Sequence, residues 1–144
     1  MSDPELPIAR GVAIVVHDGL VLVIRRQRSG RVYAVLPGGH VEPGESRAET
    51  AVRELAEETT LRAQIDEWLW TRDDGGRSAS YYLMRDVAGT PILAGEEAER
   101  HTADNSYELV WAAVTDLDVL NLQPLGIRAP LGELMTTLGP REPW

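Results

Sequence analysis

The sequence predicts an α/β fold in which a mixed β-sheet lies between helices. Short apolar segments separated by turn residues predict strands, one segment has the pattern of an amphipathic helix, and a second helix is expected near the C-terminus. The chain has 144 residues, about the size of one domain. We therefore expect a flexible N-terminal tail at residues 1–9 and a single domain over residues 10–144.

The composition argues against several classes of protein. The net charge is −9, from 23 acidic and 14 basic residues, so we expect no nucleic-acid polymer as a partner, because a nucleic-acid groove needs a basic surface. The chain has no cysteine for a disulfide, and its longest apolar runs are too short to span a membrane. The N-terminus has no signal-peptide layout. These features predict a cytoplasmic protein without a membrane partner.

The first half of the predicted domain is a series of strands that leads into a glycine-rich loop. Two apolar runs within residues 10–26 flank Asp18-Gly19, a pair typical of a tight hairpin turn. Residues 32–36 are a further short strand. The strand ends at Pro37-Gly38-Gly39, because no regular element favours that backbone.

The helix that follows has the clearest start signal in the chain. Ser46 and Glu49 have the spacing of a capping box, and Pro43-Gly44 supplies a turn before it. Five apolar residues then recur with the helical period, at Ala48, Ala51, Val52, Leu55 and Ala56. The same count places three glutamates together on the solvent side of this stripe, at Glu54, Glu57 and Glu58.

The rest of the chain is expected to complete the sheet and to add the second helix. The pattern predicts strands over residues 65–71, 78–85 and 107–114 and a helix over residues 130–138. Residues 73–76 are a turn between the first two strands, and residues 95–105 are an acidic loop.

The three glutamates are placed unfavourably for an ordinary helix surface. Like charges three or four residues apart repel one another, and the C-terminal end of a helix disfavours anions. A solvated face screened by nearby arginines is the simplest explanation. A second explanation is that the glycine-rich loop folds against this acidic face and creates an oxygen-rich site, of the kind that Mg²⁺ or Mn²⁺ selects.

The spacing of these residues resembles the Nudix box of the Nudix (MutT-like) hydrolases, G-x5-E-x7-R-E-U-x-E-E-x-G-U, where U is apolar. The matching residues are Gly39, Glu45, Arg53, Glu54, Leu55, Glu57, Glu58 and Leu61. Thr60 departs from the pattern, because it stands where the box has glycine. We expect it to change the helix end or the next loop without removing a metal ligand. The resemblance covers about residues 10–125.

The resemblance implies an α/β/α sandwich and a metal-dependent pyrophosphohydrolase. Its substrate would be a nucleoside diphosphate linked to another moiety, such as a nucleoside triphosphate, ADP-ribose or a nucleotide sugar. The metal, Mg²⁺ or Mn²⁺, would be held by Gly39, Glu54, Glu57 and Glu58. Arg53 would pair with Glu45 and hold the loop on the helix, because a guanidinium can grip a carboxylate with two hydrogen bonds.

The proton acceptor, the substrate contacts and the exact function are less narrowly defined. The acceptor would be Glu54 or a glutamate of the acidic loop, where Glu97 ranks before Glu96 and Glu99. Candidates for substrate contact are Arg25, Arg26 and Tyr33, against the alternatives of a charged hairpin end and a core aromatic residue. A non-catalytic nucleotide-binding sensor and a metal-free interaction domain are the alternative functions, and a homodimer stays open.

Overall fold

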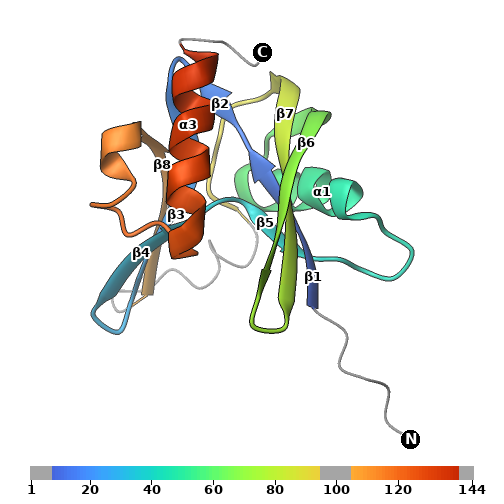
Figure 1. Cartoon of the computed structure of the whole chain (residues 1–144), viewed down its shortest axis with the longest axis horizontal. Coiled ribbons are helices and arrows are strands. Elements are labelled where there is room, and N and C mark those ends of the chain that lie inside the picture. The colour runs from blue at the N-terminus through green and yellow to red at the C-terminus, as the bar shows by residue number, and fades with distance from the viewer. Residues whose placement is uncertain (1–7, 95–104, 140–144) are drawn as a thin grey trace, which may run out of the picture.

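A computed structural model describes residues 8–94 and 105–139, and these residues form two β-sheets with helices on either side (Figure 1). Helix α1 spans Arg47–Thr59 and helix α3 spans Arg128–Leu138. Two short 3₁₀ helices, η1 (Val114–Asp116) and η2 (Leu125–Ile127), precede α3. None of the helices in these ranges is long and apolar enough to cross a membrane.

The first sheet is mixed and has the strand order β5-β1-β7-β6. Its strands are β1 (Ile8–Ile14), β5 (Gly38–His40), β6 (Arg62–Asp74) and β7 (Arg77–Ala88). Strand β1 is parallel to β7 and antiparallel to β5, and β6 is antiparallel to β7. Strand β1 begins at Ile8, inside the range predicted as a tail, because Ile8 pairs with Arg77 and donates its N–H to the Gly76 carbonyl. Residues 1–7 lie outside the described part of the chain.

The second sheet is antiparallel and is built around strand β3. Its strands are β2 (Val16–His17), β3 (Leu20–Arg28), β4 (Arg31–Val35) and β8 (Asn105–Ala112). The predicted hairpin turn is present, with positive φ angles at Asp18 and Gly19. Its first arm is divided between the sheets, however, because the chain leaves β1 at Ile14 and pairs with β3 only from Val16.

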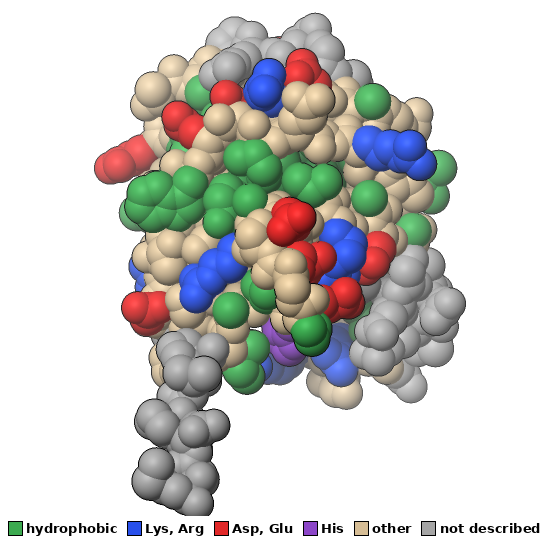
Figure 2. Space-filling view, turned by 90° about the vertical axis from the view of Figure 1, so that its right-hand side faces the viewer, with side chains coloured by type: hydrophobic (Ala, Val, Ile, Leu, Met, Phe, Trp, Pro, Cys, Tyr) green, Lys and Arg blue, Asp and Glu red, His purple; other side chains and the backbone are tan. Residues whose placement is uncertain are grey.

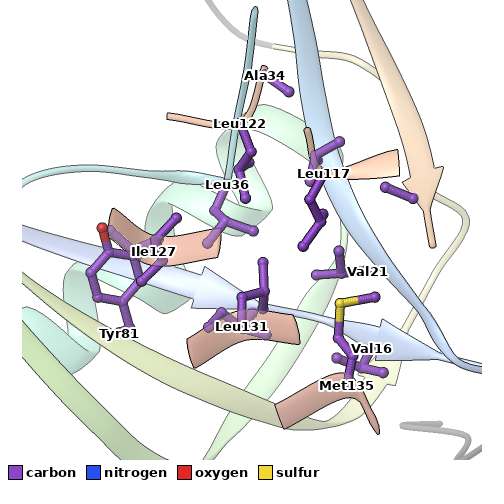
Figure 3. Packing of buried hydrophobic residues seen from close by; sticks show 14 of the residues in the cluster. Val16, Val21, Ala34, Leu36, Tyr81, Leu117, Leu122, Ile127, Leu131 and Met135 are labelled. Atoms are coloured by element: carbon purple, nitrogen blue, oxygen red, sulfur yellow. The ribbon is translucent and has the colours of Figure 1, made fainter. Parts of the chain in front are cut away.

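The core lies on both faces of this arrangement, as the alternation of buried residues along β1 shows. Val12 and Ile14 pack into the cluster under α3, whereas Ala13 and Val15 pack into the cluster under α1. In the first cluster, Leu131 and Met135 of α3 lie against strand residues such as Val21 (Figure 3). The predicted α/β/α arrangement is therefore confirmed, with α1 and α3 on opposite sides of the strands.

Candidate functional site

Helix α1 begins where the sequence predicts. The Ser46 side chain accepts a hydrogen bond from the Glu49 N–H, and the Glu49 carboxylate accepts one from the Ser46 N–H, at 3.1 and 2.9 Å. This capping box fixes the first turn. Ala51 and Leu55 are fully buried, so the apolar stripe faces the core and the acidic residues are carried along the opposite edge.

Two glycines allow the strands to lie unusually close to α1. A Cβ atom on Gly11 of β1 would lie 2.9 Å from both the Ala51 nitrogen and the Thr50 Cβ, and would overlap the Arg47 carbonyl oxygen. A Cβ atom on Gly39 of β5 would overlap the Glu54 carboxylate. The backbone around Gly39 is therefore held directly against an acidic side chain of the helix.

Arg53 holds the loop before α1 onto the helix. Its Nε donates to one Glu45 oxygen at 2.7 Å, and its Nη2 donates to the other at 3.0 Å, so the expected Arg53–Glu45 pair is present. The Thr50 hydroxyl also donates to Glu45, at 2.5 Å, and Arg53 reaches the His40 carbonyl at 3.1 Å. Hydrogen bonds from Arg53 and then Thr50 lower the pKa of Glu45 from 4.5 to about 2.

The same guanidinium gathers the glutamates of the helix. Arg53 Nη1 lies 3.0 Å from a Glu54 oxygen and 3.1 Å from a Glu57 oxygen. These contacts, with Glu45 as the largest cause, raise the pKa of Arg53. The face that carries α1 shows acidic and basic side chains side by side, next to a band of hydrophobic ones (Figure 2). Two carboxylates are thus brought to one cationic atom at the helix surface.

Unlike Glu54 and Glu57, Glu58 is buried. The residue is 5% exposed, and its carboxylate accepts a hydrogen bond from the Gly38 N–H at 2.9 Å. The expectation that all three glutamates face solvent is therefore wrong for Glu58. The helical count places it at the edge of the acidic arc, and β5 covers that edge. Glu58 joins the helix to the glycine-rich strand.

The site offers a divalent cation two carboxylates and the nearby backbone of Gly39 as ligands. Within residues 8–94 and 105–139, no group of three acidic or histidine side chains is arranged to hold a metal ion. Mg²⁺, however, is commonly held by one or two carboxylates, with waters and substrate phosphates completing its ligands. Glu54 and Glu57 offer such a pair, and Gly39, whose missing Cβ leaves room for the Glu54 carboxylate, lies beside them.

Thr60 ends the helix in the conformation that glycine favours. Its φ of 64° is left-handed, and its N–H donates to the Ala56 carbonyl at 3.0 Å. Its hydroxyl donates to the Thr90 carbonyl at 2.9 Å. The expected change in the helix end is therefore absent. A β-branched residue occupies the usual backbone position and is tied to the following loop.

A pocket of about 490 Å³ lies beside the end of β4, just before the glycine-rich loop, on the face of the strands away from α1. Two predicted substrate residues, Arg26 and Tyr33, line it, and they face each other as partners on β3 and β4. Burial alone would raise the pKa of Tyr33, but hydrogen bonds from Arg28 and Arg26 lower it overall. Arg25 does not line the pocket. It follows the opposite side of β3 and pairs with Glu108 at 3.5 Å.

Some of the predicted site residues lie outside the described part of the chain, and the pocket contains residues that were not predicted. Glu96, Glu97 and Glu99 fall within residues 95–104, so the prediction of a base there lies outside the described residues. Three more arginines line the pocket, Arg10, Arg72 and Arg77, and none of them belongs to the box or to the predicted substrate residues. The alternation of side chains along each strand predicts which face of the sheet an arginine lies on. Only the register between strands shows that these arginines are neighbours.

Comparisons with known proteins agree on one family. The NUDIX domain model matches residues 7–134. An ADP-ribose pyrophosphatase of Methanocaldococcus jannaschii is 35% identical over 60% of this chain and 54% of its own length. An RNA pyrophosphohydrolase of a Bradyrhizobium species is 37% identical over 55% of this chain and 47% of its own. The chain thus spans about half the length of these curated relatives.

The fold is similar to a solved structure of the same family. A crystal structure of a MutT NUDIX hydrolase from Burkholderia pseudomallei matches with a TM-score of 0.69 and 27% sequence identity. The match covers 86% of this chain and 96% of that chain, so the two folds agree over nearly their whole length.

Proposed function

This chain belongs to the NUDIX hydrolase family, and from that premise we propose that it is a Mg²⁺- or Mn²⁺-dependent pyrophosphohydrolase. Its substrate is a nucleoside diphosphate linked to another moiety: a nucleoside triphosphate, ADP-ribose or a nucleotide sugar. The family generally uses divalent metal ions. We further propose that the protein acts on small molecules rather than on a nucleic-acid polymer, because its net charge is −9.

One observation carries this proposal, namely the gathering of carboxylates around the Gly39 backbone. Glu54 and Glu57 both reach Arg53 Nη1, and Glu58 holds the Gly38 N–H. The assignment of Gly39, Glu54, Glu57 and Glu58 as metal ligands rests on this arrangement and on the box spacing. In the family, carboxylates at these positions are expected to bind a divalent cation, which explains why they are grouped together on the helix.

The chemistry is attack of water on a phosphorus atom of the diphosphate. A divalent cation held by Glu54, Glu57, Glu58 and the Gly39 backbone would supply positive charge to the phosphate oxygens and would lower the pKa of water. A new P–O bond forms to the water oxygen, the bridging P–O bond breaks, and the water proton passes to a carboxylate. Glu54 is the candidate acceptor among the described residues, and Glu97 is the candidate in the later loop. The Arg53–Glu45 pair holds the loop against the helix.

The proposal is tested by phosphate release from a nucleotide panel with and without Mg²⁺. The panel contains nucleoside triphosphates, ADP-ribose and nucleotide sugars. We expect turnover of at least one class that requires the metal. Glu57→Gln should lower kcat by about 100-fold, the scale of removing one electrostatic group from such a site. Glu67→Gln, an exposed glutamate on β6, is the matched control and should leave turnover unchanged.

Two outcomes would contradict the proposal. The first is turnover that does not depend on the divalent metal or on Glu57. The second is saturable nucleotide binding, measured by calorimetry, without any product, which would assign the chain to the non-catalytic sensors.

A further inference from the structure

The pocket beside the glycine-rich loop has a floor made by three neighbouring strands. Arg10 of β1 and Arg72 of β6 are both register partners of Ala79 of β7, so the three residues form one row across the sheet. All three line the pocket. Adjacent strands are about 4.8 Å apart, so the two arginines start about 10 Å apart, with a small residue between them. The row leaves an open space between two cationic side chains.

Two more arginines extend this positive surface. Arg77 lies two residues before Ala79 on β7 and therefore points to the same face. Arg26 lines the pocket from β3 of the other sheet. None of the described residues that line the pocket is acidic, although the chain as a whole has a net charge of −9. Four of its 14 basic residues are thus concentrated in one cavity.

Arg10 is held at some cost to its charged form. Burial, and then the neighbouring Arg77, lower the pKa of Arg10 overall, although the Glu58 carboxylate and Tyr81 act to raise it. The Arg72 guanidinium lies against the backbone of Gly126 in η2, where an added Cβ atom would overlap it, and its Nη1 lies 3.5 Å from the Gly126 carbonyl. The 3₁₀ segment before α3 therefore fixes the position of Arg72. A negative group in the pocket would relieve the repulsion among these arginines.

The rest of the pocket is suited to an organic group. Its other walls include Val12, Val35, Leu36, Tyr33 and Tyr81. A volume of about 490 Å³ lies in the range of small-molecule sites and exceeds the size of one phosphate. The pocket also adjoins the carboxylate site, because Val12 pairs with Gly38, whose N–H is bonded to Glu58. The pocket therefore begins next to the backbone to which Glu58 is hydrogen-bonded.

We propose that the substrate carries a further phosphate, apart from the diphosphate that is cleaved, and that Arg10, Arg72 and Arg77 bind it. The class is a nucleoside diphosphate derivative whose pocket-bound sugar or nucleoside ends in a phosphate. Guanidinium groups are the side chains best matched to phosphate, because they donate two parallel hydrogen bonds to it. An uncharged base stacked on the two tyrosines would add no negative charge beside these arginines. This inference rests on the proposed function.

The test compares ligands that differ by a single phosphate. ADP-ribose is measured against ADP-ribose 2′-phosphate and ADP-ribose 1″-phosphate, and NADH is measured against NADPH. Binding is measured by calorimetry without divalent metal, and kcat/KM is measured with Mg²⁺. We expect at least one phosphorylated ligand to bind at least about 10-fold more tightly than its counterpart, as a charged hydrogen-bonded contact allows. The advantage should also weaken as salt is raised.

Variants then show whether the arginines carry this preference. Arg72→Gln and Arg77→Gln should each reduce the advantage of the phosphorylated ligand by about 10-fold, through KM rather than kcat. The binding of the unphosphorylated counterpart should change by a smaller factor, because it lacks the phosphate that these arginines are proposed to contact. Arg85→Gln is the matched control, because Arg85 is an exposed residue of the same strand that pairs with Asp86 outside the pocket. Gly126→Ala keeps all four charges but displaces Arg72, and should also reduce the advantage.

The outcomes separate this inference from the proposed function. Equal affinity within every ligand pair, or an advantage that survives in both arginine variants, overturns the phosphate assignment even if hydrolysis is observed. A phosphate-dependent affinity without hydrolysis of any ligand supports the assignment and contradicts the proposed function instead. If Arg72→Gln fails to fold, Arg77→Gln still decides the result, because Arg77 is exposed at the pocket rim.

Discussion

At the scale of single residues, Arg53 explains how two of the three glutamates near the end of α1, Glu54 and Glu57, can lie close together. It donates to Glu45 on the loop and to Glu54 and Glu57 on α1. The repulsion expected from the sequence is thus offset by one guanidinium, whose side chain is 23% exposed and therefore only partly screened by water. The arrangement fixes the loop and the helix together without a metal, and a cation would meet carboxylates that are already in place.

The Arg53–Glu45 pair gives a pH dependence of stability with a definite sign. The pKa of Glu45 is lowered from 4.5 to about 2, so its contribution is present above pH 4.5 and is lost as the pH falls towards 2. Wild type should therefore exceed Glu45→Gln in free energy of unfolding at pH 7, and the difference should shrink between pH 4.5 and 2. Urea unfolding across this pH range measures it.

The matched control is Glu108→Gln, which removes an exposed ion pair with Arg25 on another strand. Exposed pairs contribute about 0–1 kcal/mol, so this control should change stability little at any pH. A difference between wild type and Glu45→Gln that stays constant from pH 7 to pH 2 would contradict the role given to Glu45.

At the scale of elements, the site depends on how closely α1 crosses β1 and β5. The sequence predicts the start of α1 through Ser46 and Glu49, because capping is local chemistry. It does not predict that Gly11 lies under the helix, since that contact joins residues about 40 positions apart in the chain. For the same reason the division of the first strand between two sheets at Val15 could not be foreseen.

Replacing Gly11 tests this close approach. Gly11→Ala should lower the free energy of unfolding by about 1–3 kcal/mol, because its Cβ would press on the α1 backbone and force the helix to move. Gly132→Ala in α3 is the control, since its Cβ would meet only Val114 at 3.4 Å. That change should stabilise the protein by up to about 1 kcal/mol. Equal effects of the two substitutions in urea unfolding would contradict the packing described.

At the scale of the whole molecule, the sequence predicts the fold and the acidic half of the site, but of the four arginines that line the pocket it predicts only Arg26. The box residues lie within 23 consecutive positions, so their spacing alone brings them together. Arg10, Arg26, Arg72 and Arg77 come from four strands of two sheets, and only strand register makes them neighbours. Local patterns therefore predict α1, whereas the pocket needs the complete topology. That residues 10–144 form one domain stays a prediction.

The central claim is that the carboxylates of α1 hold a divalent cation, and Mn²⁺ binding tests it most directly. Calorimetric titration of Mn²⁺ into wild type, Glu57→Gln and the control Glu67→Gln compares the three affinities. Saturable binding to wild type and to the control, weakened by about 10–100-fold in Glu57→Gln, is the predicted result. The same affinity in all three proteins, or no binding to wild type, would contradict it.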